Sequence, residues 1–207
     1  MLNQENRYHF LAIAIFFESS LIGVASLMGW WFHVDPLDRL VWDWRGGVAG
    51  LVGTVPMFAL FALAFRFPIG PMRNIKMFLI GTLGPYLMLC RWYDLLLLGA
   101  VAGISEELVF RGVLHPQFGI VSSNIVFGVA HWITPTYAAS AGLIGVYLGC
   151  LFDYSENLLA PIIAHGFYDF LAFLVVARDA RKVLSPMPEF SNTDDDSGIS
   201  PPSNGPF

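Results

Sequence analysis

The chain has 207 residues, of which 56% are hydrophobic and only 13% are charged, and its formal net charge at pH 7 is -5. A soluble globular domain of this length cannot bury so much apolar surface, so the composition excludes a soluble fold. The sequence also has no glycine-rich nucleotide-binding motif and no basic patch, and it therefore predicts no nucleic-acid partner.

Seven hydrophobic segments follow one another along the chain. A transmembrane helix needs roughly 20 apolar residues to cross about 30 Å of hydrocarbon. The segments cover residues 8–32, 47–65, 77–90, 94–114, 124–133, 137–152 and 158–177. The sequence therefore predicts an all-α fold, a polytopic transmembrane helical bundle of six to seven hydrophobic segments in contact with the lipid bilayer.

The segments form one predicted domain, residues 1–182, followed by a short tail at 183–207. The tail contains "TDDDS" and "SPPSNGP", and this acidic composition rich in proline and serine predicts disorder. The motifs described below lie between residues 94 and 177, which we take as the motif core of this domain.

Basic residues near the ends of the segments predict the orientation, because Lys and Arg favour the cytoplasmic side. Basic residues precede the first segment and follow the second and the last: Arg7, then Arg66, Arg73 and Lys76, then Arg178, Arg181 and Lys182. If all are cytoplasmic, the number of crossings is even and one of the seven segments does not cross. Segments 77–90 and 124–133 both remain candidates for it. We expect a multi-pass protein of a bacterial cytoplasmic membrane.

Segment 94–114 contains the stretch "GISEELVFRG", which holds three charges in apolar surroundings. A charged residue at the centre of a membrane helix costs roughly 2.5 to 3.5 kcal/mol or more, so such residues usually pair and mark function. Glu107 and Arg111 are four residues apart and can neutralise each other on one helix face. Glu106 points about 100° away from Glu107 and has no such partner, which makes it a candidate general base.

Two other apolar segments also contain isolated polar residues. His131 lies in "FGVAHW", and His165 and Asp169 are four residues apart in "PIIAHGFYDF". Together with Glu106 they predict a polar chamber inside the bundle. If a metal is bound, Glu106, His131 and His165 are its candidate ligands, because two histidines and a carboxylate suit Zn²⁺. A ligand carboxylate cannot easily be the base as well, so we favour a site without a cofactor and keep Zn²⁺ as the alternative.

These three motifs in this order resemble a known signature. "EELVFR", "FGVAH" and "HGFYD" are similar to the motifs of the CPBP intramembrane protease family, which includes the CAAX proteases and the bacteriocin-processing, Abi-like enzymes. The resemblance implies a hydrolase in which Glu106 and His131 activate water and in which His165 and Asp169 stabilise the oxyanion. It implies a supporting role for Glu107 and Arg111.

The predicted function is therefore that of an intramembrane endopeptidase acting on membrane-associated peptides or proteins. Substrates of the CAAX type, leader peptides, bacteriocins and sorting signals all remain open. The alternatives are a catalytically silent membrane scaffold or immunity protein and a proton-coupled transporter. A transporter usually shows repeated halves, and the sequence shows no internal repeat.

Two further features have structural interpretations. Glu18 lies in the first segment but in none of the motifs, so we expect it to make a helix-packing hydrogen bond. Ala141, Gly145 and Gly149 form a stripe of small residues at a spacing of four, which predicts that a neighbouring helix approaches closely.

Overall fold

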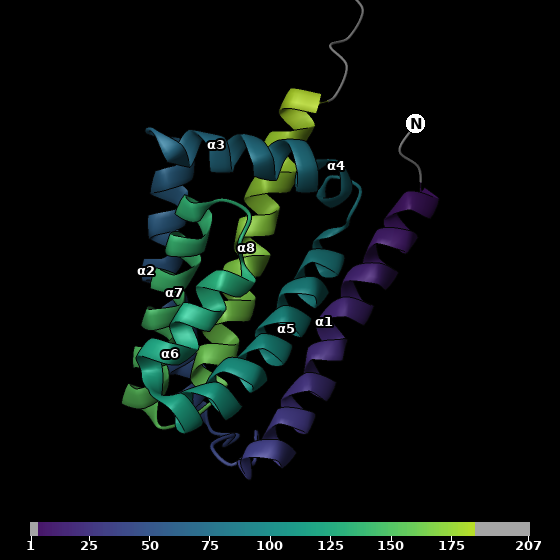
Figure 1. Ribbon diagram of the computed structural model, residues 1–207. Helices are drawn as coiled ribbons and strands as arrows, with labels where there is room; N and C mark the ends of the chain where they lie inside the picture. The colour runs from purple at the N-terminus through teal and green to yellow at the C-terminus, as the bar shows by residue number, and fades with distance from the viewer. Residues whose placement is uncertain (1–3, 185–207) are drawn as a thin grey trace, which may run out of the picture.

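The computed structural model describes residues 4–184, and within this range it is helical without strands (Figure 1). The predicted tail beyond Leu184 lies outside the described residues. The elements in chain order are α1 (Gln4–Phe32), α2 (Trp44–Arg66), α3 (Pro71–Phe78), the π-helical turn η1 (Leu79–Leu83), α4 (Gly84–Leu87), α5 (Trp92–Val109), the π-helical turn η2 (Phe110–Leu114), α6 (His115–Ala130), α7 (Pro135–Ser155) and α8 (Leu159–Leu184).

Four of the described helices, α1, α2, α7 and α8, are long and apolar enough to cross a membrane. A fifth span is possible if the bent pair Pro71–Leu87 and Trp92–Ala130, with 117° between its two parts, counts as one. The predicted all-α transmembrane bundle is thus confirmed, whereas six to seven segments are not. Segment 94–114 falls short by composition because α5 contains three acidic residues, and α6 has only 16 residues.

The arrangement of the helices indicates which segment does not cross. Helix α3 lies across one end of the bundle, at the ends of α2 and α8 (Figure 1). Segment 77–90, which begins at the end of α3, is therefore the non-crossing candidate that the structure favours. The start of α1 and the end of α8 lie at this same end of the bundle (Figure 1). This arrangement agrees with an even number of crossings.

Two substituted cysteines test the orientation, in a background where Cys90 is alanine and Cys150 is serine. Asp38 lies in the loop after α1, at the opposite end of the bundle from Lys182 in the last turn of α8. Because the basic ends are expected in the cytoplasm, an impermeant thiol reagent should label Asp38→Cys in intact cells. It should label Lys182→Cys only after permeabilisation. The reverse pattern would contradict the predicted orientation.

Glycines bring α5 and α8 into backbone contact. A Cβ atom on Gly99 would lie 2.5 Å from the carbonyl oxygen of Gly166, and one on Gly103 would lie 2.7 Å from the Gly166 nitrogen. Only glycine permits helices to approach so closely, as is common in membrane bundles. One turn beyond Gly103 on α5 come Glu106 and Glu107, and next to Gly166 on α8 comes His165. The glycines therefore set the distance between two of the polar motifs.

The predicted stripe of small residues on α7 is confirmed as a close helix contact. A Cβ atom on Gly145 would lie 2.6 Å from Asn124 Oδ1, and one on Gly149 would lie 3.0 Å from Ile120 Cγ1, both on α6. Small residues at these positions let α6 lie directly on α7.

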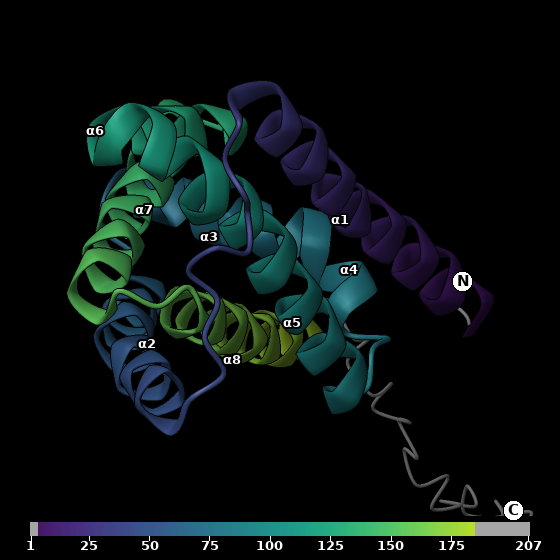
Figure 2. The ribbon, with the colours of Figure 1, turned by 90° about the horizontal axis from the view of Figure 1, so that it is seen from below.

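At the other edge of the bundle, α1 packs mainly on α5 and lies away from α2 and α7 (Figures 1 and 2). Arg7 joins the two helices through a two-pronged ion pair with Asp94, with Nε and Nη2 each 2.8 Å from a carboxylate oxygen. Arg7 was expected to be a flanking cation, but it is buried in this pair.

Candidate active site

Glu106 on α5 and His131 at the end of α6 face each other. Glu106 Oε2 lies 3.6 Å from His131 Nε2, which is longer than a hydrogen bond. Glu106 Oε2 is buried and has no hydrogen-bond partner among the described residues. The Glu106 side chain as a whole is 11% exposed and that of His131 is 27% exposed.

The hydrogen bond made by His131 Nδ1 determines whether Nε2 is a donor or an acceptor. His131 Nδ1 lies 2.9 Å from the carbonyl oxygen of Phe127, one turn earlier on α6. A carbonyl only accepts, so Nδ1 must carry the hydrogen, and in the neutral ring Nε2 is then an acceptor. An ionised Glu106 and Nε2 of a neutral His131 are two acceptors that cannot bond to each other. Both groups are able to accept hydrogen bonds from one water molecule, because water has two O–H donors.

Glu107 is the central acceptor of the buried polar network. Its Oε1 accepts from Arg111 Nη1 at 2.8 Å, as the spacing of four predicted, and also from His165 Nδ1 at 2.8 Å. Both Glu107 and Arg111 have side chains that are 0% exposed. Glu107, one of the two predicted supporting residues, thus also orients His165. The sequence analysis did not predict this contact.

Arg111 connects three elements, η2, α6 and α7, through its hydrogen bonds. It lies in η2, and its Nη2 donates to Asn124 Oδ1 on α6 at 3.1 Å and to the Gly145 carbonyl on α7 at 2.6 Å. Its guanidinium also lies 5.0 Å from the centre of the Phe127 ring. Sequence reasoning missed Asn124 as part of this network. The signal that could have found it is an amide side chain within an apolar segment, seven residues before His131.

His165 lies between two carboxylates. Its Nδ1 bonds Glu107, and its Nε2 is 3.5 Å from Asp169 Oδ2, one turn further along α8. The structure therefore brings Glu106, His131, His165 and Asp169 into one region, with Glu107 and Arg111 behind them. In this arrangement Glu106 is a proton acceptor, His131 is an imidazole that faces it, and His165 is a second imidazole between Glu107 and Asp169.

Glu18 also reaches this region, from α1. Its Oε2 accepts a hydrogen bond of 3.2 Å from the Ser105 hydroxyl, so the predicted helix-packing hydrogen bond is confirmed. Ser105 directly precedes Glu106, and Glu18 is within electrostatic range of His131 and His165 as well. The sequence analysis did not place Glu18 at the site, because no motif contains it.

The candidate zinc ligands do not converge in this arrangement. Among residues 4–184, no three His, Cys, Asp or Glu side chains are placed to hold one metal ion. Glu106 and His131 face each other, and Nδ1 of His165 donates to Glu107, which leaves Nε2 as the nitrogen that could bind a metal. The choice between a site without a cofactor and the Zn²⁺ alternative therefore stays a prediction.

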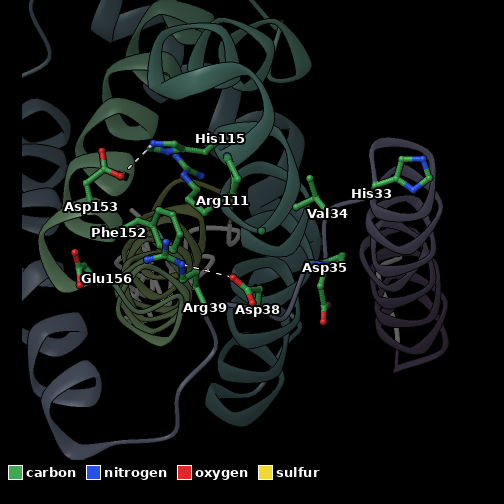
Figure 3. Close-up of a pocket in the computed structure, with 13 residues that line it drawn as sticks. His33, Val34, Asp35, Asp38, Arg39, Arg111, His115, Phe152, Asp153 and Glu156 are labelled. Atoms are coloured by element: carbon green, nitrogen blue, oxygen red, sulfur yellow. Dashed lines mark ion pairs between the residues drawn. The ribbon is translucent and has the colours of Figure 1, made fainter.

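A cavity of about 640 Å³ lies beside the polar network, at the end of the bundle opposite the start of α1 and the end of α8 (Figure 3). Of the predicted site residues only Arg111 lines it, and His115 and Asp153, 3.2 Å apart, contribute to its wall. The cavity is thus separate from Glu106 and His131.

Glu106, Glu107, Arg111, His131, His165 and Asp169 together form the polar cluster. The helical bundle and this cluster define a class: a multi-pass integral membrane protein with a buried polar site. Residues 88–171 match a family described as type II CAAX prenyl endopeptidase Rce1-like. All three motifs lie within this range, and the match confirms the resemblance to the CPBP and CAAX protease family. Because this is a family of proteases, the match supports a hydrolase.

One curated relative is similar to part of the chain. It is the uncharacterized protein YpbD of Bacillus subtilis strain 168, which is 26% identical over 81 residues. The similarity covers 36% of this chain, and the chain spans 41% of the length of the relative. No solved structure matches the chain.

Proposed function

We propose that this protein is an intramembrane endopeptidase that cleaves membrane-associated peptides or proteins with water activated by Glu106 and His131. The observation that carries the proposal is the pair of facing acceptors, Glu106 Oε2 and His131 Nε2, which lie 3.6 Å apart, with Oε2 buried and without a hydrogen-bond partner among the described residues. The match to a protease family supports it. We also propose the bacterial cytoplasmic membrane as its location.

The reaction follows from these two groups. Glu106 takes a proton from the substrate water while His131 Nε2 accepts a hydrogen bond from its second O–H. The water oxygen then attacks the peptide carbonyl carbon, and the carbonyl oxygen becomes an oxyanion. When the C–N bond breaks, the proton on Glu106 moves to the departing nitrogen. The products are a carboxylic acid and an amine, and the reaction needs no metal step.

The oxyanion requires hydrogen-bond donors on the other side of the carbonyl. His165 and Asp169 are the candidates: because Nδ1 of His165 donates to Glu107, Nε2 is a donor only in the protonated ring, and Asp169 is a donor only as the neutral acid. An ionised Asp169 would repel an oxyanion, whereas a protonated one donates a hydrogen bond to it. We therefore propose that Asp169 acts as a neutral donor.

Asp169→Asn tests this role, because an asparagine N–H can donate where a protonated aspartate donated. The variant should keep most of the cleavage rate, measured on a quenched fluorescent peptide in detergent. Chelation of metal ions should leave the wild-type rate unchanged. Loss of activity in a normally folded Asp169→Asn protein would show that Asp169 works in its ionised form. Inactivation by chelators would point instead to a metal ligand.

The substrate class is a separate part of the proposal. A prenylated C-terminal peptide of the CAAX type is the candidate that the family match favours, and leader or sorting peptides are the alternatives. Comparing membrane proteomes with and without this gene should reveal proteins that accumulate uncut. If none of them has a cleavage site near a membrane, the proposed substrate class is wrong.

A further inference from the structure

Glu18 occupies an unfavourable position for a charged residue. It lies at the midpoint of α1 (Gln4–Phe32), a candidate membrane span. Its neighbours Phe16 and Phe17 are 78% and 63% exposed, as expected of side chains that face lipid. A carboxylate at this depth is costly, and such residues usually have a function.

The hydrogen bond of Glu18 does not compensate this cost, and no ion pair with Lys or Arg does so among the described residues. The bond from Ser105 to Glu18 Oε2 comes from a neutral hydroxyl, and among residues 4–184 no Lys or Arg pairs with Glu18. A glutamine or threonine could accept the same bond without a charge. The second oxygen, Oε1, has no hydrogen-bond partner in the described part of the chain, and it is not among the fully buried atoms.

The position of Glu18 relative to the polar cluster suggests where Oε1 is used. Glu18 interacts electrostatically with Glu106, His131 and Asp169 as well as with His165. Helix α1 forms the edge of the bundle next to α5 (Figure 2). The carboxylate therefore stands at the lipid-facing side of the candidate active site, next to the part of α5 that holds Glu106.

We propose that Glu18 is a substrate-binding residue whose Oε1 accepts a hydrogen bond from a donor of the substrate close to the cleaved bond. This inference rests on the proposed peptidase function. A peptide in a dry site has backbone N–H groups that are costly to leave unpaired, and an ionised acceptor binds them strongly. A cationic side chain of the substrate offers the same donor chemistry.

Three variants and one control test the role of Glu18. Glu18→Leu removes the charge and the acceptor, and Glu18→Gln keeps an acceptor without the charge. Ser105→Ala removes the hydroxyl that donates to Glu18 and that also lies 3.3 Å from the Ala102 carbonyl oxygen. Ser20→Leu, an exposed polar residue on the same helix, controls for added apolar surface. The probe is the quenched fluorescent peptide that the wild type cleaves best from a library, with KM and kcat measured in detergent.

Glu18→Leu should raise KM by about tenfold or more while kcat changes by less than about threefold, the signature of lost binding. In Glu18→Gln, a KM near that of the wild type identifies a backbone N–H as the donor. A KM that rises only for peptides with Lys or Arg near the cleaved bond identifies a cationic side chain. Ser105→Ala should change KM less than Glu18→Leu does. An unchanged KM in Glu18→Leu, or a loss confined to kcat, would overturn the inference.

Thermal unfolding in detergent gives a readout that does not depend on activity. Because a binding carboxylate at mid-membrane is unfavourable for the free protein, Glu18→Leu should raise the unfolding midpoint more than Ser20→Leu does. A lower midpoint would show that Glu18 is a packing residue, and would overturn the inference even if the protein is a peptidase. If the wild type shows no cleavage that depends on Glu106, the proposed function fails instead.

Discussion

Replacing Glu106 with glutamine should abolish peptide cleavage while the protein still inserts and folds. Glutamine has nearly the same shape, but it cannot take a proton from water. General acid–base catalysis contributes roughly 10²- to 10⁴-fold, so the rate should fall by at least that factor. Folding should be preserved because Glu106 Oε2 has no hydrogen-bond partner among the described residues that the substitution could remove.

The measurement compares initial rates on the quenched peptide with yield and thermal unfolding midpoint in the same detergent. Glu156→Gln is a matched control, since Glu156 lies at the far end of the bundle after α7 and not at the polar cluster. The control should retain the wild-type rate. Turnover that persists in Glu106→Gln would exclude Glu106 as the base.

Replacing Arg111 with alanine should instead destabilise the fold, by about 3 to 5 kcal/mol for removal of one partner of a buried ion pair. Glu107 would remain fully buried without its cation, and the acceptors on Asn124 and Gly145 would lose their donor. Because Arg111 connects η2 with α6 and α7, the loss should loosen the packing of all three. Denaturant titration in detergent measures the free energy of unfolding.

Arg39→Ala is the matched control, because Arg39 is 57% exposed and lies 3.6 Å from Asp38. Loss of such a surface pair should change stability by less than about 1 kcal/mol. The double variant Glu107→Leu with Arg111→Met should recover part of the stability lost in Arg111→Ala, since it removes both charges of the pair and leaves only His165 Nδ1 without its acceptor. A stable Arg111→Ala protein would argue against the structural role of the pair.

The results expected for Glu106→Gln and Arg111→Ala assign different roles to the neighbouring residues Glu106 and Glu107. Glu106 has an oxygen without a partner and faces His131, whereas Glu107 bonds both Arg111 and His165. Successive residues on a helix point about 100° apart, so one turns toward the substrate region and the other toward the packed network. The pair thus combines a proposed chemical role with a structural one.

Sequence alone was sufficient for the class of fold and for contacts within one helix. Backbone polar groups in lipid must pair internally, so apolar segments of this length form helices. The helical geometry then places Glu107 beside Arg111 and His165 beside Asp169, because residues four apart share a face. The sequence also indicated which polar residues matter, because a charged or polar side chain deep within an apolar segment is costly and is usually functional.

Only the tertiary structure decided the contacts between helices. It showed that α3 lies across the end of the bundle, that Glu107 orients His165 over 58 residues of sequence, and that Glu18 meets Ser105 over 87. Such contacts depend on the rotation of each helix about its axis and on the close backbone approach that Gly103 and Gly166 permit. A change of a few tenths of an ångström in this approach is enough to alter them. Hydrophobic periodicity within one segment contains no information on the partner that its polar side chains meet, because that partner comes from another helix.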